Sequence, residues 1–305
     1  MLQIYYTVVR SGRREYDIIR GRMRQSAVFG ALIILAVCVG ACSGTQKDAG
    51  YYRASQQLSK DSTDKLKAGI RGISNDLFEP GMYTGSNEIA IRYRLLRPDT
   101  TKKKDRYPLV LVLHGSGAVG TDNMAQLGIL VKLWAQPGIR ERYPAYVVAP
   151  QFPRRSSNYS PAPDKKVLVS TPDACLTTAL QLIDSLKKVL PVDERKIYVI
   201  GFSMGASGAI NSLALRPDLF AAAVSISGIP ELDRTEVLAH IPLWLVHGNA
   251  DTENPIPSDS LLFKELQAVK GRKVRFWEVD HLEHDIYYRL YTSEELPEWL
   301  FRQRR

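Results

Sequence analysis

The stretch KIYVIGFSMGASGAINSLAL, residues 196–215, predicts a strand that turns directly into a helix. Its β-rich run ends at Ile200, the turn at 201–205 reads Gly-Phe-Ser-Met-Gly, and small and apolar residues continue to Leu215. A Gly-x-Ser-x-Gly turn of this kind needs its glycines because they leave room for neighbouring backbone while the serine hydroxyl is pushed outward. The stretch therefore indicates an α/β fold with Ser203 exposed at the end of a strand.

Further apolar runs predict the rest of the sheet. Two of them, LVLVL at 109–113 and LWLV at 243–246, are continuous, which is typical of parallel strands with both faces covered. Apolar residues at helical spacing occur in 173–190 and 258–270. This alternation predicts one doubly wound α/β domain with a mostly parallel sheet. The expected strands are 89–96, 109–113, 146–149, 197–200, 222–225, 243–246 and 274–279.

Composition excludes several other classes of protein. The 305-residue chain is 45% hydrophobic and 24% charged, which is unlike a wholly disordered, collagenous or coiled-coil protein. No segment recurs at a fixed period, so solenoids and propellers are not supported. The formal net charge is +9. The segment before residue 42 contributes +4 of this, because it has six arginines and two acidic residues. The remaining basic runs are short and suit solvated surface, so we expect no nucleic-acid partner.

A serine at such a turn becomes a nucleophile when a histidine takes its proton and a carboxylate orients that histidine. On this kind of sheet the three residues follow one another in the order Ser, Asp, His. Asp251 lies in the loop after the strand expected at 243–246, at the carboxyl edge where open α/β sheets build their sites. Asp251 is therefore the candidate acid, and Asp259, at the start of the next expected helix, better fits a helix-capping role.

The five histidines are at positions 114, 240, 247, 281 and 284. Those at 114 and 247 open His-Gly pairs at strand ends and are interpreted as structural, and that at 240 as solvated. His281 and His284 follow the last expected strand, and one of them should be the base. His284 is preferred because it opens a helical segment expected at 285–291, and His281 is the alternative base.

Acyl transfer also needs N–H donors for the developing oxyanion. The backbone of Met204, next to the serine, is one candidate, and the backbone of Ser116, in the HGSG segment 114–117, is the other. The HGSG segment contains no Gly-x-Gly-x-x-Gly pattern, so a dinucleotide site is not indicated. His281 and His284 lack a third ligand, so we expect neither a metal nor another cofactor.

Several segments together are more specific than the serine turn alone. They are YRLLRP at 93–98, YPL at 107–109, HGSG at 114–117, GTDN at 120–123, APQ at 149–151, RPDLFAAAV at 216–224 and HGNAD at 247–251. With the turn, they resemble the bacterial phospholipase/carboxylesterase and polyhydroxybutyrate-depolymerase-like branch of the α/β-hydrolases. The resemblance implies Ser203, Asp251 and His284 as a catalytic triad. His281 and Glu283 stand where that branch has glycines.

This reading leads to a serine hydrolase that cleaves carboxylic esters through an acyl-Ser203 intermediate. Its substrate would be a small-molecule or polymeric ester. Two alternatives remain: a serine peptidase of the same fold, and a catalytically inactive binding protein on a hydrolase scaffold.

The apolar run AVFGALIILAVCV at 27–39 is 13 residues long, short of the roughly 20 that span a bilayer as a helix. Small residues and Cys42 follow, which resembles a bacterial lipoprotein signal peptide with its lipobox. The resemblance implies cleavage before Cys42 and lipid attachment there, anchoring the protein to a membrane. Cys38 is the weaker candidate because Val37 precedes it, and a short transmembrane anchor is the alternative to a signal peptide.

The chain is accordingly divided into four parts. If Met23 is the true start, residues 1–22 lie upstream of the natural protein; otherwise they extend the charged start of the signal. Residues 23–41 would be the signal peptide, the polar segment 42–76 a flexible tether, and 77–305 the catalytic domain. The expected location is the cell envelope, facing the periplasm or the exterior.

Overall fold

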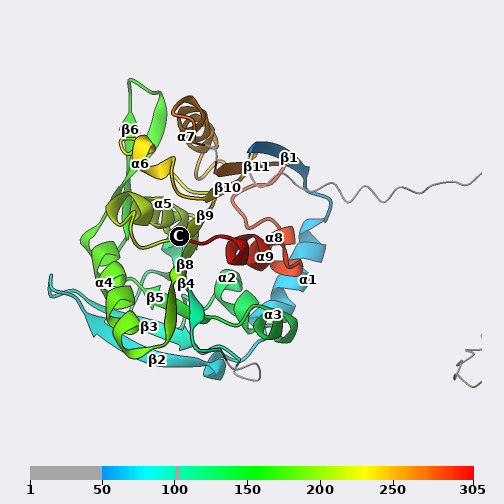
Figure 1. Ribbon diagram of the computed structural model, residues 1–305. Coiled ribbons are helices and arrows are strands. Elements are labelled where there is room, and N and C mark those ends of the chain that lie inside the picture. Colours follow the sequence, from blue (N-terminus) through cyan, green and yellow to red (C-terminus); the bar gives the residue numbers. More distant parts are fainter. Residues whose placement is uncertain (1–49, 100–103, 272) are drawn as a thin grey trace, which may run out of the picture. The chain divides into compact units, whose positions relative to one another are not determined.

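The computed structural model describes residues 50–99, 104–271 and 273–305. In these ranges, nine strands form one sheet in the order β1-β11-β10-β9-β8-β4-β5-β3-β2 (Figure 1). The strands are β1 (Gly50–Ser55), β2 (Phe78–Thr84), β3 (Ala90–Leu96), β4 (Tyr107–Leu113), β5 (Tyr146–Gln151), β8 (Val192–Phe202), β9 (Ala222–Ile226), β10 (Leu243–Gly248) and β11 (Val274–Asp280). The pairs β2–β3 and β3–β5 are antiparallel, and the other neighbours are parallel. The expectation of a mostly parallel α/β sheet is confirmed.

Helices cover both faces of the sheet, with α4 and α5 on one side and α2, α3 and α9 on the other (Figure 1). The α-helices are α1 (Lys60–Arg71), α2 (Ile129–Lys132), α3 (Pro137–Arg142), α4 (Ala174–Val189), α5 (Met204–Leu215), α6 (Thr235–Leu238), α7 (Pro257–Ala268), α8 (Arg289–Thr292) and α9 (Glu295–Arg302). Short 3₁₀ turns are η1 (Asn75–Leu77), η2 (Ser116–Ala118) and η3 (Leu133–Ala135). This arrangement is doubly wound.

The apolar runs of the sequence are buried because each strand contributes to two cores. All seven residues of β4 are buried. Leu109 and Leu111 pack into the core that includes α4, α5 and α7, whereas Val110 and Val112 pack into the core that includes α2 and α9. Since successive side chains point to opposite faces of a strand, a central strand covered on both faces must be apolar throughout.

The flexible tether predicted for 42–76 is wrong for residues 50–76, and the folded domain therefore begins before residue 77. Strand β1 pairs in parallel with β11, from Gly50 opposite Arg275 to Ser55 opposite Asp280. Helix α1 follows, and its Ile70 packs with Ile129 and Tyr291. The composition was misleading because β1 is an edge strand and α1 buries only one narrow face, so neither needs many large apolar residues.

Further elements differ from the sequence expectations. Strand β2 was not predicted, and neither was a separate hairpin of β6 (Ser157–Ala162) and β7 (Val167–Pro172). The helix expected at 285–291 begins only at Arg289, since the preceding residues make side-chain contacts to the β1–α1 segment instead.

The lipidation candidates Cys42 and Cys38, the parts 1–22 and 23–41, and residues 42–49 lie outside the described residues. Within the described ranges, no helix combines the length and the apolarity needed to cross a membrane.

Candidate active site

Ser203 lies at the sharp turn between β8 and α5, with φ 57° and ψ −122°. This backbone conformation is strained for a residue with a side chain. The flanking glycines make the turn possible, because a Cβ on Gly201 would lie 2.1 Å from the Gly205 carbonyl oxygen. A Cβ on Gly205 would lie 2.1 Å from the Leu113 carbonyl oxygen. Both glycines are therefore required by contacts between backbone segments, and the turn holds Ser203 at the carboxyl end of β8. The expectation of an exposed serine is wrong, because only 9% of the Ser203 surface is exposed.

The structure brings Ser203, Asp251 and His284 together from three separate loops. His284 Nε2 lies 2.9 Å from Ser203 Oγ, and His284 Nδ1 lies 2.7 Å from Asp251 Oδ2. An ionised carboxylate only accepts hydrogen bonds, so Nδ1–H donates to Asp251 and Nε2 is left to accept the Ser203 hydroxyl proton. The arrangement can therefore deprotonate the serine.

Asp251 is held as an ionised acceptor. Its Oδ1 accepts hydrogen bonds from the Glu253 and Asn254 amides, both at 2.9 Å. Burial by itself would raise the pKa of Asp251, but hydrogen bonds from His247 and His284 outweigh burial and hold this pKa well below its usual range. The carboxylate is charged at any pH at which a histidine acts as a base.

The loop that carries His284 docks directly on the loop that carries Asp251. A Cβ on Gly248 would lie 2.0 Å from the Leu282 carbonyl oxygen, so only glycine allows this approach. The Ala250 amide donates to Leu282 O at 3.1 Å, and the His281 amide donates to Asn249 Oδ1 at 2.9 Å. These backbone contacts set the depth at which His284 enters the site.

The same loop is held from its other side by the N-terminal β1–α1 segment. Lys67 of α1, nearly buried, forms an ion pair with Asp285 at 2.5 Å. The Tyr287 hydroxyl donates to the Ser55 carbonyl oxygen at 3.1 Å. The segment expected to be a tether therefore anchors the residues beside His284.

Each of the two expected oxyanion donors is the first residue of a helix. Met204 is the first residue of α5 and Ser116 the first of η2, so neither amide has an acceptor inside its own helix. The Ser116 segment lies beside the nucleophile, since a Cβ on Gly115 would lie 3.4 Å from Ser203 Cβ. Both amides are available for an oxyanion near Ser203.

His114 stabilises this segment, in agreement with its structural interpretation. Its Nε2 accepts a hydrogen bond from the Phe152 amide at 3.0 Å, so its Nδ1–H donates to Gly115 O at 2.7 Å. Burial lowers the pKa of His114, which keeps the ring neutral as these bonds require.

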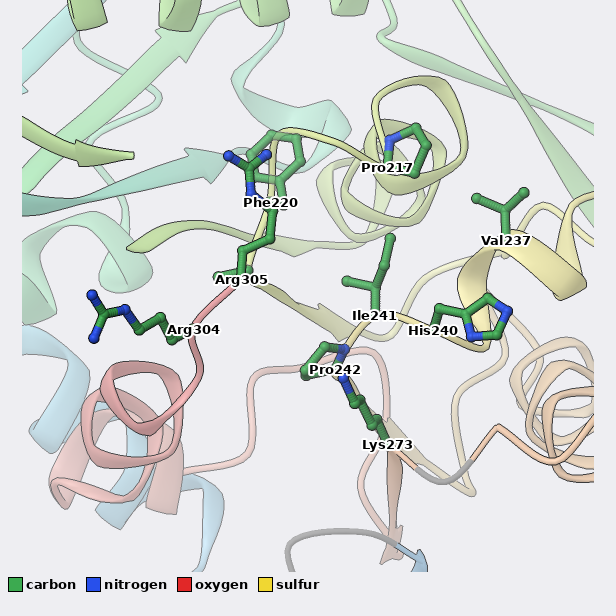
Figure 2. Close-up of a pocket in the computed structure, with 10 residues that line it drawn as sticks. Pro217, Phe220, Val237, His240, Ile241, Pro242, Lys273, Arg304 and Arg305 are labelled. Atoms are coloured by element: carbon green, nitrogen blue, oxygen red, sulfur yellow. The ribbon is translucent and has the colours of Figure 1, made fainter. Parts of the chain in front are cut away.

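His240 lies at the opposite, amino-terminal edge of the strands. It is exposed and lines a surface pocket of about 340 Å³ together with Pro242, Lys273 and Arg304 (Figure 2). Strand β10 runs from this edge to the edge where Asp251 lies, so His240 is too distant to serve Ser203.

His281 is exposed and lies three residues before His284 on the same loop, with φ 59°. It does not stack on Trp277, which is fully buried and whose ring meets Tyr52, Trp244, Tyr287 and the guanidinium groups of Arg275 and Arg289. The left-handed backbone at His281 turns its side chain to solvent while its amide supports the loop.

The place of His247 beside Asp251 was not predicted. This ring is fully buried behind the acid: Nε2 lies 2.7 Å from Asn254 O and 3.3 Å from Asp251 Oδ2, and Nδ1 lies 2.8 Å from Asp259 Oδ2. Burial alone would lower the pKa of His247, but its hydrogen bonds to the two carboxylates raise it to about 9. The spacing of four residues between His247 and Asp251 was the available signal.

The helix-capping role expected for Asp259 is also wrong. Helix α7 has Ile256 at its N-cap and no side-chain capping bond, and the fully buried Asp259 carboxylate binds His247 instead. Nothing in the local pattern distinguishes these roles, because a first-turn aspartate suits either one.

The β6–β7 hairpin reaches the helix that follows the nucleophile. Ser207, one turn after Ser203, donates to the Tyr159 hydroxyl at 3.1 Å and accepts from the Ile229 amide at 2.9 Å. The Arg155 guanidinium lies 4.9 Å from the centre of the Tyr159 ring. No sequence signal indicated that Tyr159 belongs near the site.

Among the described residues, no group of three or more His, Cys, Asp and Glu side chains is arranged to hold a metal ion.

Comparison with known proteins is consistent with this geometry. The family model Esterase, described as "Putative esterase", matches residues 86–280. "Putative esterase NocK" of Nocardia uniformis subsp. tsuyamanensis is 30% identical over 166 residues, covering 53% of this chain and 46% of NocK. The aligned part thus spans about half of that relative.

Two solved structures extend the comparison. One, described as a thermostable esterase, has a TM-score of 0.67 and 32% identity, over 75% of this chain and 64% of its own. An S-formylglutathione hydrolase from Staphylococcus aureus has a TM-score of 0.51 and 14% identity, over 73% of this chain and 97% of its own. At that identity the second likeness shows the fold alone.

Proposed function

Because the chain belongs to the Esterase family, we propose that it hydrolyses carboxylic esters with Ser203 as nucleophile, His284 as base and Asp251 as the acid that orients the base. One observation carries the proposal: His284 bridges the two partners at 2.9 Å and 2.7 Å. These contacts fit the tautomer that the reaction requires, with the proton on Nδ1.

In the first half of the reaction, His284 Nε2 takes the hydroxyl proton of Ser203 while Oγ forms a bond to the ester carbonyl carbon. The carbonyl electrons move to oxygen, and the Ser116 and Met204 amides stabilise that oxyanion. The C–O bond to the alcohol then breaks, and the alcohol leaves with the proton that His284 held. The product of this step is an acyl-Ser203 ester.

In the second half, His284 removes a proton from water, and the resulting hydroxide attacks the acyl carbon. A second oxyanion forms and collapses, and Ser203 Oγ leaves with the proton from His284. The carboxylic acid is released and the serine is restored. Asp251 stays ionised throughout, because its role is to hold Nδ1–H and stabilise the imidazolium.

The test is labelling with a fluorophosphonate, which reacts with serines activated in this way, followed by assays on nitrophenyl esters and a peptide anilide. We expect labelling and ester hydrolysis by the wild type and their loss in Ser203→Ala, by roughly a million-fold in turnover. Ser86→Ala, an exposed serine in the β2–β3 turn, is the matched control and should behave as wild type.

Each remaining outcome has a definite meaning. Faster cleavage of the anilide than of the esters would favour a serine peptidase. No labelling and no hydrolysis by folded wild type would leave an inactive scaffold and refute the proposal.

We further propose that the protein is exported and anchored by lipid at Cys42, on the basis of the lipobox-like sequence. Cys42→Ser should release the protein from the detergent phase on phase separation. An unmodified N-terminus at Met1 or Met23, found by mass spectrometry, would contradict this proposal.

A further inference from the structure

The site contains a buried histidine–carboxylate pair that the proposed reaction does not use. His247 and Asp259 are both completely buried, and the His247 ring stands between Asp259 and the Asp251 carboxylate. With the triad they form one continuous chain of contacts from Ser203 through His284, Asp251 and His247 to Asp259.

The contacts of His247 define where its protons are. A backbone carbonyl only accepts hydrogen bonds, so the nitrogen that faces Asn254 O at 2.7 Å, Nε2, carries a proton. Nδ1 faces the Asp259 carboxylate at 2.8 Å, and a further proton lies between these two atoms. The ionised Asp251, 3.3 Å from Nε2, favours the state in which His247 holds both protons and is an imidazolium.

We propose that His247 and Asp259 act as positioning residues that place a buried positive charge behind Asp251 and so keep His284 in its proton-accepting form at lower pH. This inference rests on the proposed function of the triad. A carboxylate with one histidine neighbour stabilises the protonated form of that histidine. A second, positively charged histidine on the same carboxylate repels the proton charge and so destabilises that protonated form.

The size of the effect follows from the geometry. The two nitrogens that contact Asp251 Oδ2 do so at 2.7 and 3.3 Å, so they are at most about 6 Å apart. The Asp259 carboxylate lies on the far side of the His247 ring, and its negative charge cancels only part of the effect. With an effective dielectric constant of about 20, the remaining repulsion corresponds to about one pH unit.

The other ionisable groups around the pair have their own partners or are exposed to solvent. Glu253 lies 3.8 Å from His284 Nε2, but its side chain is 74% exposed and its charge is screened. Glu278 on β11, opposite His247, accepts hydrogen bonds from Tyr51 and Asn249. Asp285 pairs with Lys67, and burial raises the pKa of Tyr159, which stays neutral. None of these groups replaces Asp259.

The decisive variant is Asp259→Asn, which keeps the shape of the side chain, removes the charge and can donate an amide N–H to the deprotonated Nδ1 of His247. His247 should then be neutral, and the acid side of the pH profile of kcat/KM for an activated ester should move up by about one pH unit. At pH 9 the activity should stay within a few-fold of wild type. Asp218→Asn, an exposed aspartate paired with Arg216, is the matched control and should leave the profile in place.

A purely structural role gives a different result. If Asp259→Asn lowers activity equally at every pH, without moving the acid side of the profile, the inference is wrong. His247→Gln should cause the same shift as Asp259→Asn, and the double variant should not shift the profile further. Additive shifts would also contradict a single charged pair.

A spectroscopic measurement separates this inference from the proposed function. In ¹⁵N-histidine NMR spectra of the whole protein, one ring should keep both protons up to about pH 9. That ring should lose one proton in Asp259→Asn, and its signals should be absent in His247→Gln. This holds in the inactive Ser203→Ala protein as well. If no such ring is found, the inference is wrong even if the protein is an active esterase. If the protein is inactive, the NMR spectra still show whether His247 and Asp259 form a charged pair. If Asp259→Asn does not fold, the spectra of the wild type and of His247→Gln still test the inference.

Discussion

Replacement of Lys67 by methionine tests whether the N-terminal segment holds the catalytic loop. Lys67 lies on α1, with a side chain only 8% exposed, and its ammonium group forms an ion pair with Asp285, next to His284. Methionine keeps most of the aliphatic volume of lysine and removes the charge. The substitution therefore leaves Asp285 without its partner.

The energetic cost follows from burial of the two partners. Two unit charges at this distance would interact by several kcal/mol at an effective dielectric constant of about 20. The Asp285 side chain is 38% exposed, so water recovers much of that energy. We expect a loss of about 1–2 kcal/mol, which lowers Tm by about 3–6 °C in a domain of this size. A loosened loop should also reduce kcat/KM by roughly tenfold, since misplacement of a base by a fraction of an ångström is costly.

The assays are thermal unfolding and steady-state hydrolysis of a nitrophenyl ester, with Lys65→Met as the control. Lys65 is exposed on the same helix, so its substitution should change neither quantity. A double-mutant cycle with Asp285→Asn isolates the pair, because the two substitutions should be less than additive in both measurements. Full activity in Lys67→Met, together with strict additivity, would refute the idea that this segment positions His284.

The remaining predictions concern the site itself. His284→Ala should be nearly as inactive as a variant lacking the nucleophile, while His281→Ala keeps substantial turnover; the reverse pattern on one activated ester would make His281 the base. Gly205→Ala should destabilise the fold by roughly 3 kcal/mol in urea unfolding, because its Cβ would meet the Leu113 carbonyl at 2.1 Å, and unchanged stability would show that the turn can relax. The raised pKa of His247 stabilises the folded state fully below the unfolded value of about 6.5. That contribution is lost as pH rises through about 9, so stability that increases over this interval would contradict the assignment.

The central strands of the sheet and the turn that carries Ser203 were predictable because their signals are local. Continuous apolar runs such as the one in β4 are needed wherever both faces of a strand are covered. The structure extends five of the predicted strands by one or two residues and β8 by seven. The turn at Ser203 needs glycine on either side for contacts made within a few residues of chain and with one neighbouring strand. Asp251 could be chosen because parallel strands place their carboxyl ends at one edge.

Other features depend on residues that are far apart in the chain, and these were missed. Strand β1 is polar because it lies at an edge, and its place in the sheet comes from pairing with β11, more than 200 residues later. Tyr159 meets Ser207 only because the β6–β7 hairpin packs against helix α5, and nothing in its own neighbourhood in the sequence marks it.

His284 and Asp259 illustrate the difference between what local sequence predicts and what the folded chain determines. Sequence order and family resemblance were enough to choose His284 over His281, but its contact with Ser203 depends on Gly248, Leu282 and Lys67, which meet only in the folded chain. Asp259 stands near the start of a helix, as helix-capping aspartates do. Its pairing with His247 follows instead from the packing of α7 on β10. Local patterns report the conformation and burial that a residue requires, whereas the partner of a buried charge is set by the packing of distant elements, which no local pattern contains.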